Sequence, residues 1–383
     1  MPAARVVYFQ RVFTPRRLAF APALLLLACR TESPAPPVSS PSAAPVEQAE
    51  TPAQSPAVAR EPLAQETHFK SLRQLTFGGQ NAEAYLSFAE DQLIFQSTRD
   101  GMGCDQIFTM KLDGSNTKMV SSGRGRTTCA YFMPGDDRIL YSSTHAAADD
   151  CLPPPDRSKG YVWKLYDEFD IYVANADGTD VQVLAASPGY DAEATVSPRG
   201  DAIVFTSTRD GDPELYLLKL DGSDPRRLTH APGYDGGAFF SFDGSKIIWR
   251  ANRPEGPEEQ AKYEELRNEG LVRPTRLELM VMNADGSKQR QVTNNGAANF
   301  GPFWHPDGER VIFASNVGDP NGRNFDLHIV DIATGEDAEQ VTFDAEFDGF
   351  PMFTRDGKQL VFASNRHHAK DGDTNVFIAE WVD

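Results

Sequence analysis

The sequence predicts an all-β fold, a six-bladed β-propeller whose blades are four-stranded antiparallel sheets. One pattern of alternating and apolar segments recurs six times, and the interval between equivalent turns, at Asp177 and Asp221, is about 44 residues. Asp-Gly pairs mark turns inside these units. The sixth unit lacks its last strand, and a matching segment precedes the first unit. A closed ring of blades accounts for all of these observations.

The first half of each unit predicts a hairpin of two strands. A polar residue opens an alternating segment, and a turn connects that segment to an apolar run. In the third unit the turn is the Ser-Pro-Arg-Gly-Asp sequence of residues 197–201, whose chemistry suits a tight hairpin. The six first halves align without a gap and cover residues 81–95, 127–141, 191–205, 235–249, 299–313 and 348–362.

The second half of a unit adds a third strand, an Asp-Gly turn and a fourth strand, as in residues 215–229. The sixth unit stops after its third strand, at residues 375–381. Residues 69–76, with the sequence Phe-Lys-Ser-Leu-Arg-Gln-Leu-Thr, match the fourth strands of the other units. We therefore expect 69–76 to pair with 375–381 and to close the ring, because the last blade would otherwise keep an open edge.

These units resemble the TolB-type (PD40, WD40-like) repeat, in which Ser-Pro-Asp-Gly-Lys precedes an apolar strand and Arg-x-Leu-Thr ends the unit. The resemblance covers residues 69–383, and the Gly-His and Trp-Asp pairs of the WD type are missing. It implies a TolB-like propeller in a periplasmic setting. It does not imply the role of TolB in the Tol–Pal system, because only a tether precedes the propeller here and not the N-terminal domain of TolB.

The N-terminus predicts a lipoprotein signal peptide over residues 1–28. Several arginines and no acidic residue precede an apolar run, 18–28, that is too short to span a bilayer. The run ends in Leu-Leu-Ala-Cys, which resembles the lipobox of bacterial lipoproteins and implies a lipid on Cys29. An ordinary secretory peptide is the alternative. We expect a lipid-anchored protein of the bacterial cell envelope that faces the periplasm or lies at the outer membrane.

Composition divides the rest of the chain and excludes one class of partner. Residues 29–66 are rich in Pro, Ala and Ser and predict a disordered tether, which leaves 67–383 for the propeller. The chain has 55 acidic and 37 basic residues, a formal charge of −18. Such a charge repels phosphate backbones, so we expect no nucleic-acid partner. We also expect a monomer.

Two insertions predict a binding surface on one face of the propeller. They lie in the second and fourth units, at 144–168 and 253–275, and the second insertion predicts a helix over 257–268. The first insertion carries Tyr161, Trp163 and Tyr166. Functional loops concentrate where a rigid scaffold tolerates insertion, so both loops are expected to wall the channel mouth. Alternatively, they only cover neighbouring blade edges.

The first residue of each inner strand is polar and predicts a ring at the same mouth, formed by Asn81, Thr127, Asp191, Asp235, Asn299 and Asp348. Glu83 and Glu193 follow two positions later in two of the strands. Oxygen ligands suit Ca²⁺, with Asp191, Asp235 and Asp348 as candidate metal ligands. The alternative is that these side chains cap turns and bond the neighbouring blade. In that case they would pair with arginines that recur after the second strand, namely Arg99, Arg209, Arg253 and Arg366; His145 and Val317 replace the arginine in two blades.

No catalytic residues are evident in the sequence, which lacks a Gly-x-Ser-x-Gly elbow. We expect a non-enzymatic module that binds an envelope protein or a glycan with its looped face. The alternative is a lyase or hydrolase that acts on an acidic or sugar substrate, with Glu193 and the aspartates supplying a base and a metal site. His367, His368, Asp371 and Asp373 are read as a solvated loop rather than a second metal site.

Three cysteines remain after Cys29, namely Cys104, Cys129 and Cys151. An oxidising compartment favours one disulfide among them. Cys104–Cys129 would join adjacent blades and is the preferred pairing, whereas Cys129–Cys151 would hold the insertion over the channel mouth. The alternative is three buried thiols.

Overall fold

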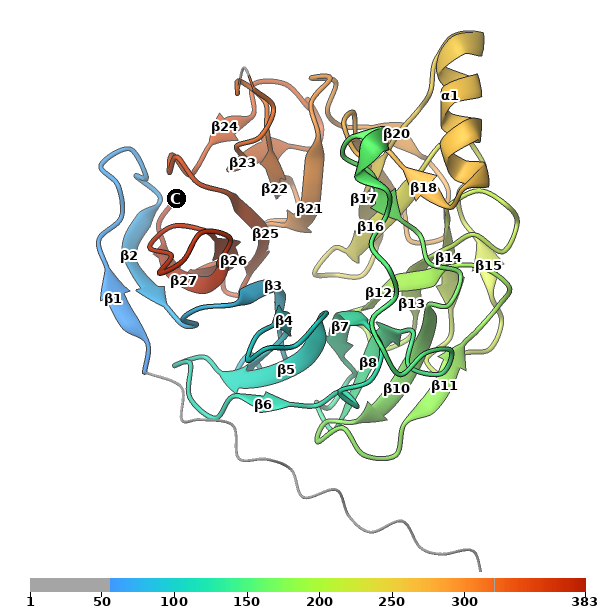
Figure 1. Ribbon diagram of the computed structural model, residues 1–383. Coiled ribbons are helices and arrows are strands. Elements are labelled where there is room, and N and C mark those ends of the chain that lie inside the picture. The colour runs from blue at the N-terminus through green and yellow to red at the C-terminus, as the bar shows by residue number, and fades with distance from the viewer. Residues whose placement is uncertain (1–55, 320) are drawn as a thin grey trace, which may run out of the picture. The chain divides into compact units, whose positions relative to one another are not determined.

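The structure is a computed structural model, and it describes residues 56–319 and 321–383. The predicted signal peptide, Cys29 and the first part of the tether lie outside the described residues. The described chain forms six small antiparallel sheets that follow one another around a ring, as Figure 1 shows. The predicted six-bladed propeller is therefore confirmed.

Each of the first five blades has four strands in sequence order from the channel outward. Blade one contains β3 (Gln80–Leu86), β4 (Gln92–Thr98), β5 (Gln106–Lys111) and β6 (Lys118–Met119). Blade two contains β7 (Thr127–Phe132), β8 (Arg138–Ser143), β10 (Asp170–Asn175) and β11 (Gln182–Ala185). Blade three contains β12 (Asp191–Val196), β13 (Ile203–Ser207), β14 (Glu214–Leu218) and β15 (Arg226–Arg227). Blade four contains β16 (Asp235–Phe240), β17 (Lys246–Ala251), β19 (Glu278–Asn283) and β20 (Arg290–Gln291). Blade five contains β21 (Asn299–Trp304), β22 (Arg310–Ser315), β23 (Asp326–Asp331) and β24 (Glu339–Gln340).

The sixth blade closes the ring with strands from both ends of the chain. It contains β25 (Asp348–Phe353), β26 (Gln359–Ser364) and β27 (Asn375–Trp381), followed by β2 (Phe69–Gln74) and β1 (Val58–Arg60). The pairing of β2 with β27 confirms the predicted closure. β1 pairs with β2 as a fifth strand.

The predicted tether boundary at residue 66 is wrong, because the chain is already part of the propeller at β1. Glu66 is buried, and its carboxylate Oε1 lies 2.8 Å from Nη2 of Arg366 in the sixth blade. The same guanidinium nitrogen lies 2.7 Å from Oδ2 of Asp348. Backbone pairing and a buried ion pair thus hold a segment that has few large apolar residues.

The inner strand of every blade contains a bulge, and the bulge residue stands two positions after the polar ring residue of that blade. The register of the inner strand shifts across this bulge in all six blades. The bulge residue has a positive φ in all six blades, and these residues are Glu83, Cys129, Glu193, Gly237, Gly301 and Phe350. A bulge bends a strand and re-aims a side chain. This feature determines which residues face the channel.

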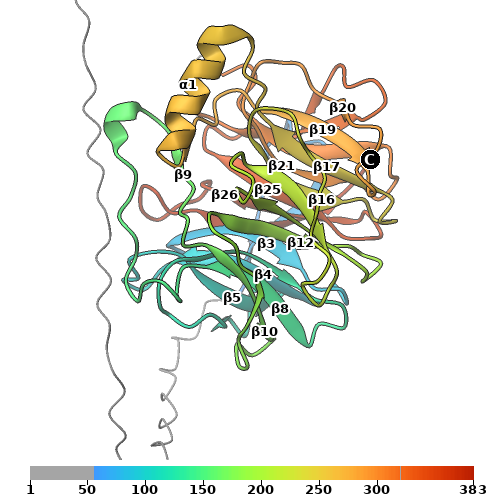
Figure 2. The ribbon, with the colours of Figure 1, turned by 90° about the vertical axis from the view of Figure 1, so that its right-hand side faces the viewer.

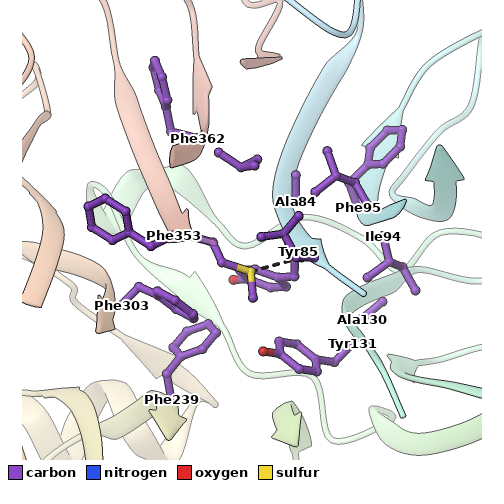
Figure 3. Close-up of a cluster of buried hydrophobic side chains, with 14 of the residues drawn as sticks. Ala84, Tyr85, Ile94, Phe95, Ala130, Tyr131, Phe239, Phe303, Phe353 and Phe362 are labelled. Carbon is purple, nitrogen blue, oxygen red and sulfur yellow. Dashed lines mark hydrogen bonds between the residues drawn. The ribbon is translucent and has the colours of Figure 1, made fainter. Parts of the chain in front are cut away.

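Aromatic side chains fill the channel below the bulges. Tyr85 lies 5.6 Å from Tyr131 and 5.3 Å from Phe239 between ring centroids, and Phe239 lies 5.4 Å from Phe303. All four are buried and point toward one another in Figure 3. These rings therefore pack against one another across the channel, between blades one, two, four and five.

The two insertions meet on that face. β9 (Trp163–Lys164) of the first pairs with β18 (Leu271–Val272) of the second in a small separate sheet. The first also contains a short 3₁₀ helix, η1 (Arg157–Lys159), and the second contains α1 (Gly256–Asn268), the predicted helix. Figure 2 shows β9 and α1 side by side on the propeller. No helix in the described segments is long and apolar enough to cross a membrane.

Candidate ligand-binding site in the channel mouth

A cavity of about 980 Å³ occupies the channel mouth on the looped face. All six blades contribute to its lining, and the first insertion adds residues 161–166. Tyr161, Trp163 and Tyr166, the predicted insertion-loop residues, all belong to this lining. Tyr161 is 66% exposed, Trp163 is half-buried and Tyr166 is buried, so the three rings extend from the rim into the wall.

The bulge residues form the floor of this cavity. Glu83, Cys129, Glu193 and Phe350 line it, and they also line a smaller space of about 30 Å³ beneath it together with Gly237 and Gly301. Glu83 and Glu193 are thus the two predicted channel-mouth residues that reach the cavity. Cys129 and Phe350 occupy equivalent positions and were missed. The signal for them was available, because they stand two residues after the polar ring positions.

Glu193 is held by a dense set of hydrogen-bond donors. Its carboxylate accepts hydrogen bonds from Thr206 Oγ1 at 2.7 Å, Tyr234 Oη at 3.0 Å and the Gly237 amide at 3.0 Å. Arg250 completes the set with an ion pair to Oε1. Gly237 lies close to this arginine, and a Cβ at position 237 would displace the guanidinium from its present place. The bulge in blade four therefore leaves room for the arginine of its own second strand.

Glu83 lies in a different environment on the same floor. Burial, with the charges of Glu193 and Asp105 adding to it, raises the pKa of Glu83 to about 7. The Arg250 charge and a hydrogen bond with Cys129 oppose that rise. Burial also raises the pKa of the Cys129 thiol, and the two glutamates reinforce this effect. At neutral pH the floor therefore holds a partly protonated Glu83 and a neutral thiol beside the ion pair of Glu193 with Arg250.

A continuous arc of aromatic rings forms one wall of the cavity. Ring centroids are 5.2 Å apart for Trp163 and Phe300, 5.0 Å for Phe300 and Phe325, 6.0 Å for Phe325 and Phe347, and 6.1 Å for Phe347 and Phe350. All five side chains line the cavity and are half-buried. The Arg250 guanidinium carbon lies 5.2 Å from the Trp163 ring centroid, so the insertion covers the Glu193 cluster.

The predicted polar ring does not face the channel mouth. All six of its members are fully buried and absent from the cavity lining: Asn81, Thr127, Asp191, Asp235, Asn299 and Asp348. The amides of Asn81 and Asn299 donate to backbone carbonyls of the preceding blade, at Thr374 and Leu277 respectively. These contacts agree with the alternative given in the sequence analysis, in which the polar residues bond the neighbouring blade rather than bind a metal ion.

The recurring arginines pair with this buried ring. Arg209 contacts Asp191 at 3.1 Å, Arg253 contacts Asp235 at 2.6 Å and Arg366 contacts Asp348 at 2.7 Å. Arg99 donates to Asn81 Oδ1 at 2.8 Å. In blade two, Thr127 bonds Ser143 at 2.9 Å, and the His145 ring packs on Tyr172 with its Nδ1 2.8 Å from Ser143 Oγ.

This pairing does not support the predicted calcium site. Asp191, Asp235 and Asp348 belong to three blades, and each is bonded to its own arginine. Within residues 56–319 and 321–383 no group of three or more His, Cys, Asp or Glu side chains is arranged to hold a metal ion. In the loop at 367–373, His368 lies 3.6 Å from Asp371, and Asp373 accepts a hydrogen bond from the Gly79 amide at 3.1 Å.

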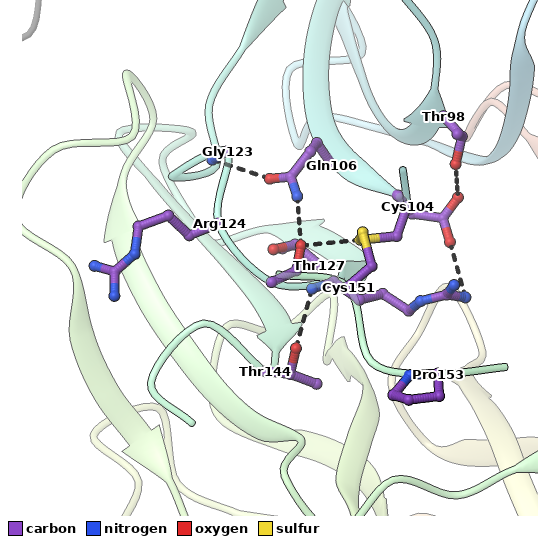
Figure 4. The surroundings of a disulfide bond; sticks show 12 residues. Thr98, Cys104, Gln106, Gly123, Arg124, Thr127, Thr144, Cys151 and Pro153 are labelled. Carbon is purple, nitrogen blue, oxygen red and sulfur yellow. Dashed lines mark hydrogen bonds and ion pairs between the residues drawn. A yellow bond between two sulfur atoms is a disulfide. The ribbon is translucent and has the colours of Figure 1, made fainter. Parts of the chain in front are cut away.

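The preferred disulfide pairing is wrong. Cys104 is bonded to Cys151, with Cα atoms 5.9 Å apart (Figure 4). Cys129 is free. The physical reason is the bulge, because it turns Cys129 toward the cavity and away from the other two cysteines. The bond joins the loop before β5 in blade one to the first insertion.

The comparisons with known proteins agree with this fold. The model of the TolB beta propeller domain, PD40, matches residues 155–271. A putative TolB from Agrobacterium tumefaciens is 16% identical with a TM-score of 0.50, and the match covers 80% of this chain and 91% of that chain. TolB from Acinetobacter baumannii is 18% identical with a TM-score of 0.52, over 79% of this chain and 63% of that chain. No curated protein matches the sequence. The chain therefore has a TolB-like six-bladed β-propeller fold.

Proposed function

We propose that the protein is a lipid-anchored binding module of the cell envelope, and that its channel-mouth cavity takes up part of a protein or glycan partner. The aromatic cavity walled by Trp163 is the observation that carries the proposal. Its volume of about 980 Å³ falls at the upper end of the range for ligand pockets, and such pockets combine apolar walls with a few polar groups. Anchoring at Cys29 would present this cavity to envelope components.

The loop arrangement supports binding on this face. The two insertions are joined by the β9–β18 pair, and the Cys104–Cys151 bond fastens the first insertion to blade one. The cavity wall is therefore built in advance, which lowers the entropy that a ligand would otherwise lose in ordering the loops. A role restricted to covering blade edges would not require half-buried aromatic rings around an open cavity.

The test compares cavity variants in two capture assays. The anchored protein is incubated with envelope extract and, separately, with an array of envelope glycans. Trp163→Ala should lower capture of the partner at least tenfold, whereas Val183→Ala should leave capture unchanged because Val183 is 60% exposed on the outer strand β11. Capture of neither class by the unmodified protein, or equal capture by Trp163→Ala, would overturn the proposal.

An enzyme acting on a sugar or acidic substrate is the second candidate, and the pair of floor carboxylates favours it. Glu83 is partly protonated and Glu193 is held by Arg250, so the two have the environments expected of an acid and a negatively charged partner. Incubation with the captured glycan and an assay for new reducing ends would separate the candidates. Release of reducing ends that Glu193→Gln abolishes would favour the enzyme.

A further inference from the structure

Most charges that line the cavity have a polar partner, and among the described residues Glu83 at the floor and the exposed Arg323 are two that form no ion pair. Arg250 pairs with Glu193, and Arg126 lies 3.4 Å from Asp105. Lys164 donates to the Glu269 carbonyl at 2.6 Å. In the part of the chain that the structure describes, no basic side chain lies within ion-pair distance of Glu83, although Glu83 lines the cavity. The unpaired charge at the floor is therefore negative.

The groups that face Glu83 reinforce this polarity. Glu193 and Asp105 act on it from neighbouring positions, and Arg250 is the cation that opposes them. Cys129, on the adjacent blade, is its hydrogen-bond partner. Since Arg250 is already paired with Glu193, Glu83 has no cation of its own, and an added positive charge at the floor would be attracted to its carboxylate.

The aromatic arc reaches the same floor. Phe350 occupies the bulge of blade six, which adjoins blade one, and it lines both the cavity and the space beneath it with Glu83. Aromatic faces attract organic cations, and a carboxylate beside them supplies the opposite charge. An inorganic cation would need several oxygen ligands, which phenyl rings do not provide. The combination fits a cation with an apolar body.

We propose that the cavity recognises an organic ammonium group, which the Glu83 carboxylate binds at the floor while the arc from Trp163 to Phe350 packs against the apolar body of the ligand. This inference rests on the proposed function, because it names the chemistry of the ligand for the same cavity. A basic side chain of a protein or an amino group of a sugar would present such a group.

Proton release provides a direct measure of the contact. Because the pKa of Glu83 is about 7, the free carboxyl is about half protonated at pH 7, and pairing with a cation would displace about 0.5 proton. A neutral ligand of the same shape would displace none. The number of released protons is obtained as the slope of the observed binding enthalpy plotted against the ionisation enthalpy of the buffer.

The experiment titrates the full chain with 2-phenylethylammonium and with its neutral counterpart 2-phenylethanol, by calorimetry at pH 7 in two buffers. We expect the ammonium probe to bind at least tenfold more tightly and to release protons. Glu83→Gln should remove both effects. Glu309→Gln, an exposed glutamate on the β21–β22 hairpin of the opposite face, should remove neither.

Equal affinities for the two probes, no detectable binding of the ammonium probe at millimolar concentration, or unchanged binding by a folded Glu83→Gln variant would overturn the inference. If Glu83→Gln does not fold, the proton release of the unmodified protein decides it. Capture of a partner that depends on Trp163, without any preference for the ammonium probe, would refute this inference and leave the proposed function standing. To distinguish the sources, lysine and glucosamine are titrated in the same way.

Discussion

Loss of the Cys104–Cys151 bond should lower the free energy of unfolding by about 4 kcal/mol. The two cysteines are 47 residues apart in the sequence. In the chain-entropy account, closing a loop of that length removes about 14 cal/mol/K from the unfolded chain, which is about 4 kcal/mol at 25 °C. Replacing both cysteines with serine removes this constraint and leaves neither an unpaired thiol nor a large cavity.

The measurement is denaturant unfolding of the double variant, followed by circular dichroism with and without reductant. Reductant should shift the unmodified protein toward the double variant and should leave the variant itself unchanged. Cys129→Ala is the control, because Cys129 is free and its replacement keeps the bond. The reasoning would be refuted if the double variant unfolded at the same denaturant concentration as the unmodified protein, or if a non-reduced digest placed Cys129 in the bond.

Three further predictions concern the closure of the ring and its buried charges. Arg366→Met should lower the free energy of unfolding by about 3–5 kcal/mol, measured by thermal unfolding, because it leaves Glu66 and Asp348 buried without their cation. A decrease in that free energy of less than about 1 kcal/mol would contradict this prediction. The pKa values of Glu83 and Asp348 are raised by burial to about 7 and about 6, so both carboxyls bind protons more tightly in the folded state. The stability that these two protonated carboxyls contribute is fully present below their pKa values in the unfolded chain, 4.5 and 3.8, and is lost as the pH rises through 6 to 7. The melting temperature should therefore fall from pH 5 to pH 8, and a melting temperature that rises over this range would contradict the prediction. Leu72→Asp puts a charge at a position of β2 that is 1% exposed and should make the protein insoluble or lower its melting temperature, whereas a soluble protein with an unchanged melting temperature would argue against closure by β2.

The propeller and its closure could be predicted because both depend on short-range patterns. Turn residues and alternating strands recur in each unit, and a missing strand at one end implies a partner at the other. The pairing of Leu72 in β2 with Ala379 in β27 follows from that count of strands. The paired insertions were also predictable as a group, since both fall in the same type of connection between second and third strands.

The direction of side chains near the channel could not be predicted from alternation alone. The polar ring was expected in the channel mouth because its members begin the inner strands on the looped face. A regular strand would also turn Asn81 and Glu83 to the same side. The bulge after Ala82 breaks the alternation, so Asn81 stays buried between blades while Glu83 enters the cavity. The sequence contains no separate signal for the bulge, because only two of its six positions are glycine.

The predictions of the disulfide pairing and of the tether boundary were wrong because both depend on contacts that the sequence pattern does not show. Blade alignment indicates the face on which Cys104, Cys129 and Cys151 lie, but not their distances from the channel axis. Composition likewise assigned residues 56–66 to the tether, since hydrophobic burial is absent there. The backbone pairing of β1 and the ion pair of Glu66 hold this segment on the propeller, and neither interaction can be recognised from amino-acid composition.

The bulge position of the inner strands separates what the fold requires from what the cavity requires. Each blade holds this residue at a positive φ, which costs a non-glycine residue about 1–2 kcal/mol relative to glycine. Glycine fills the position in blades four and five, so the fold can be built without a side chain there. The other four blades nevertheless carry Glu83, Cys129, Glu193 and Phe350, and these four side chains form the cavity floor. The fold alone would favour glycine at all six positions. Glu193 is accounted for by its contacts with Arg250 and Tyr234, whereas the side chains of Glu83 and Phe350 agree with the proposed binding function of the cavity.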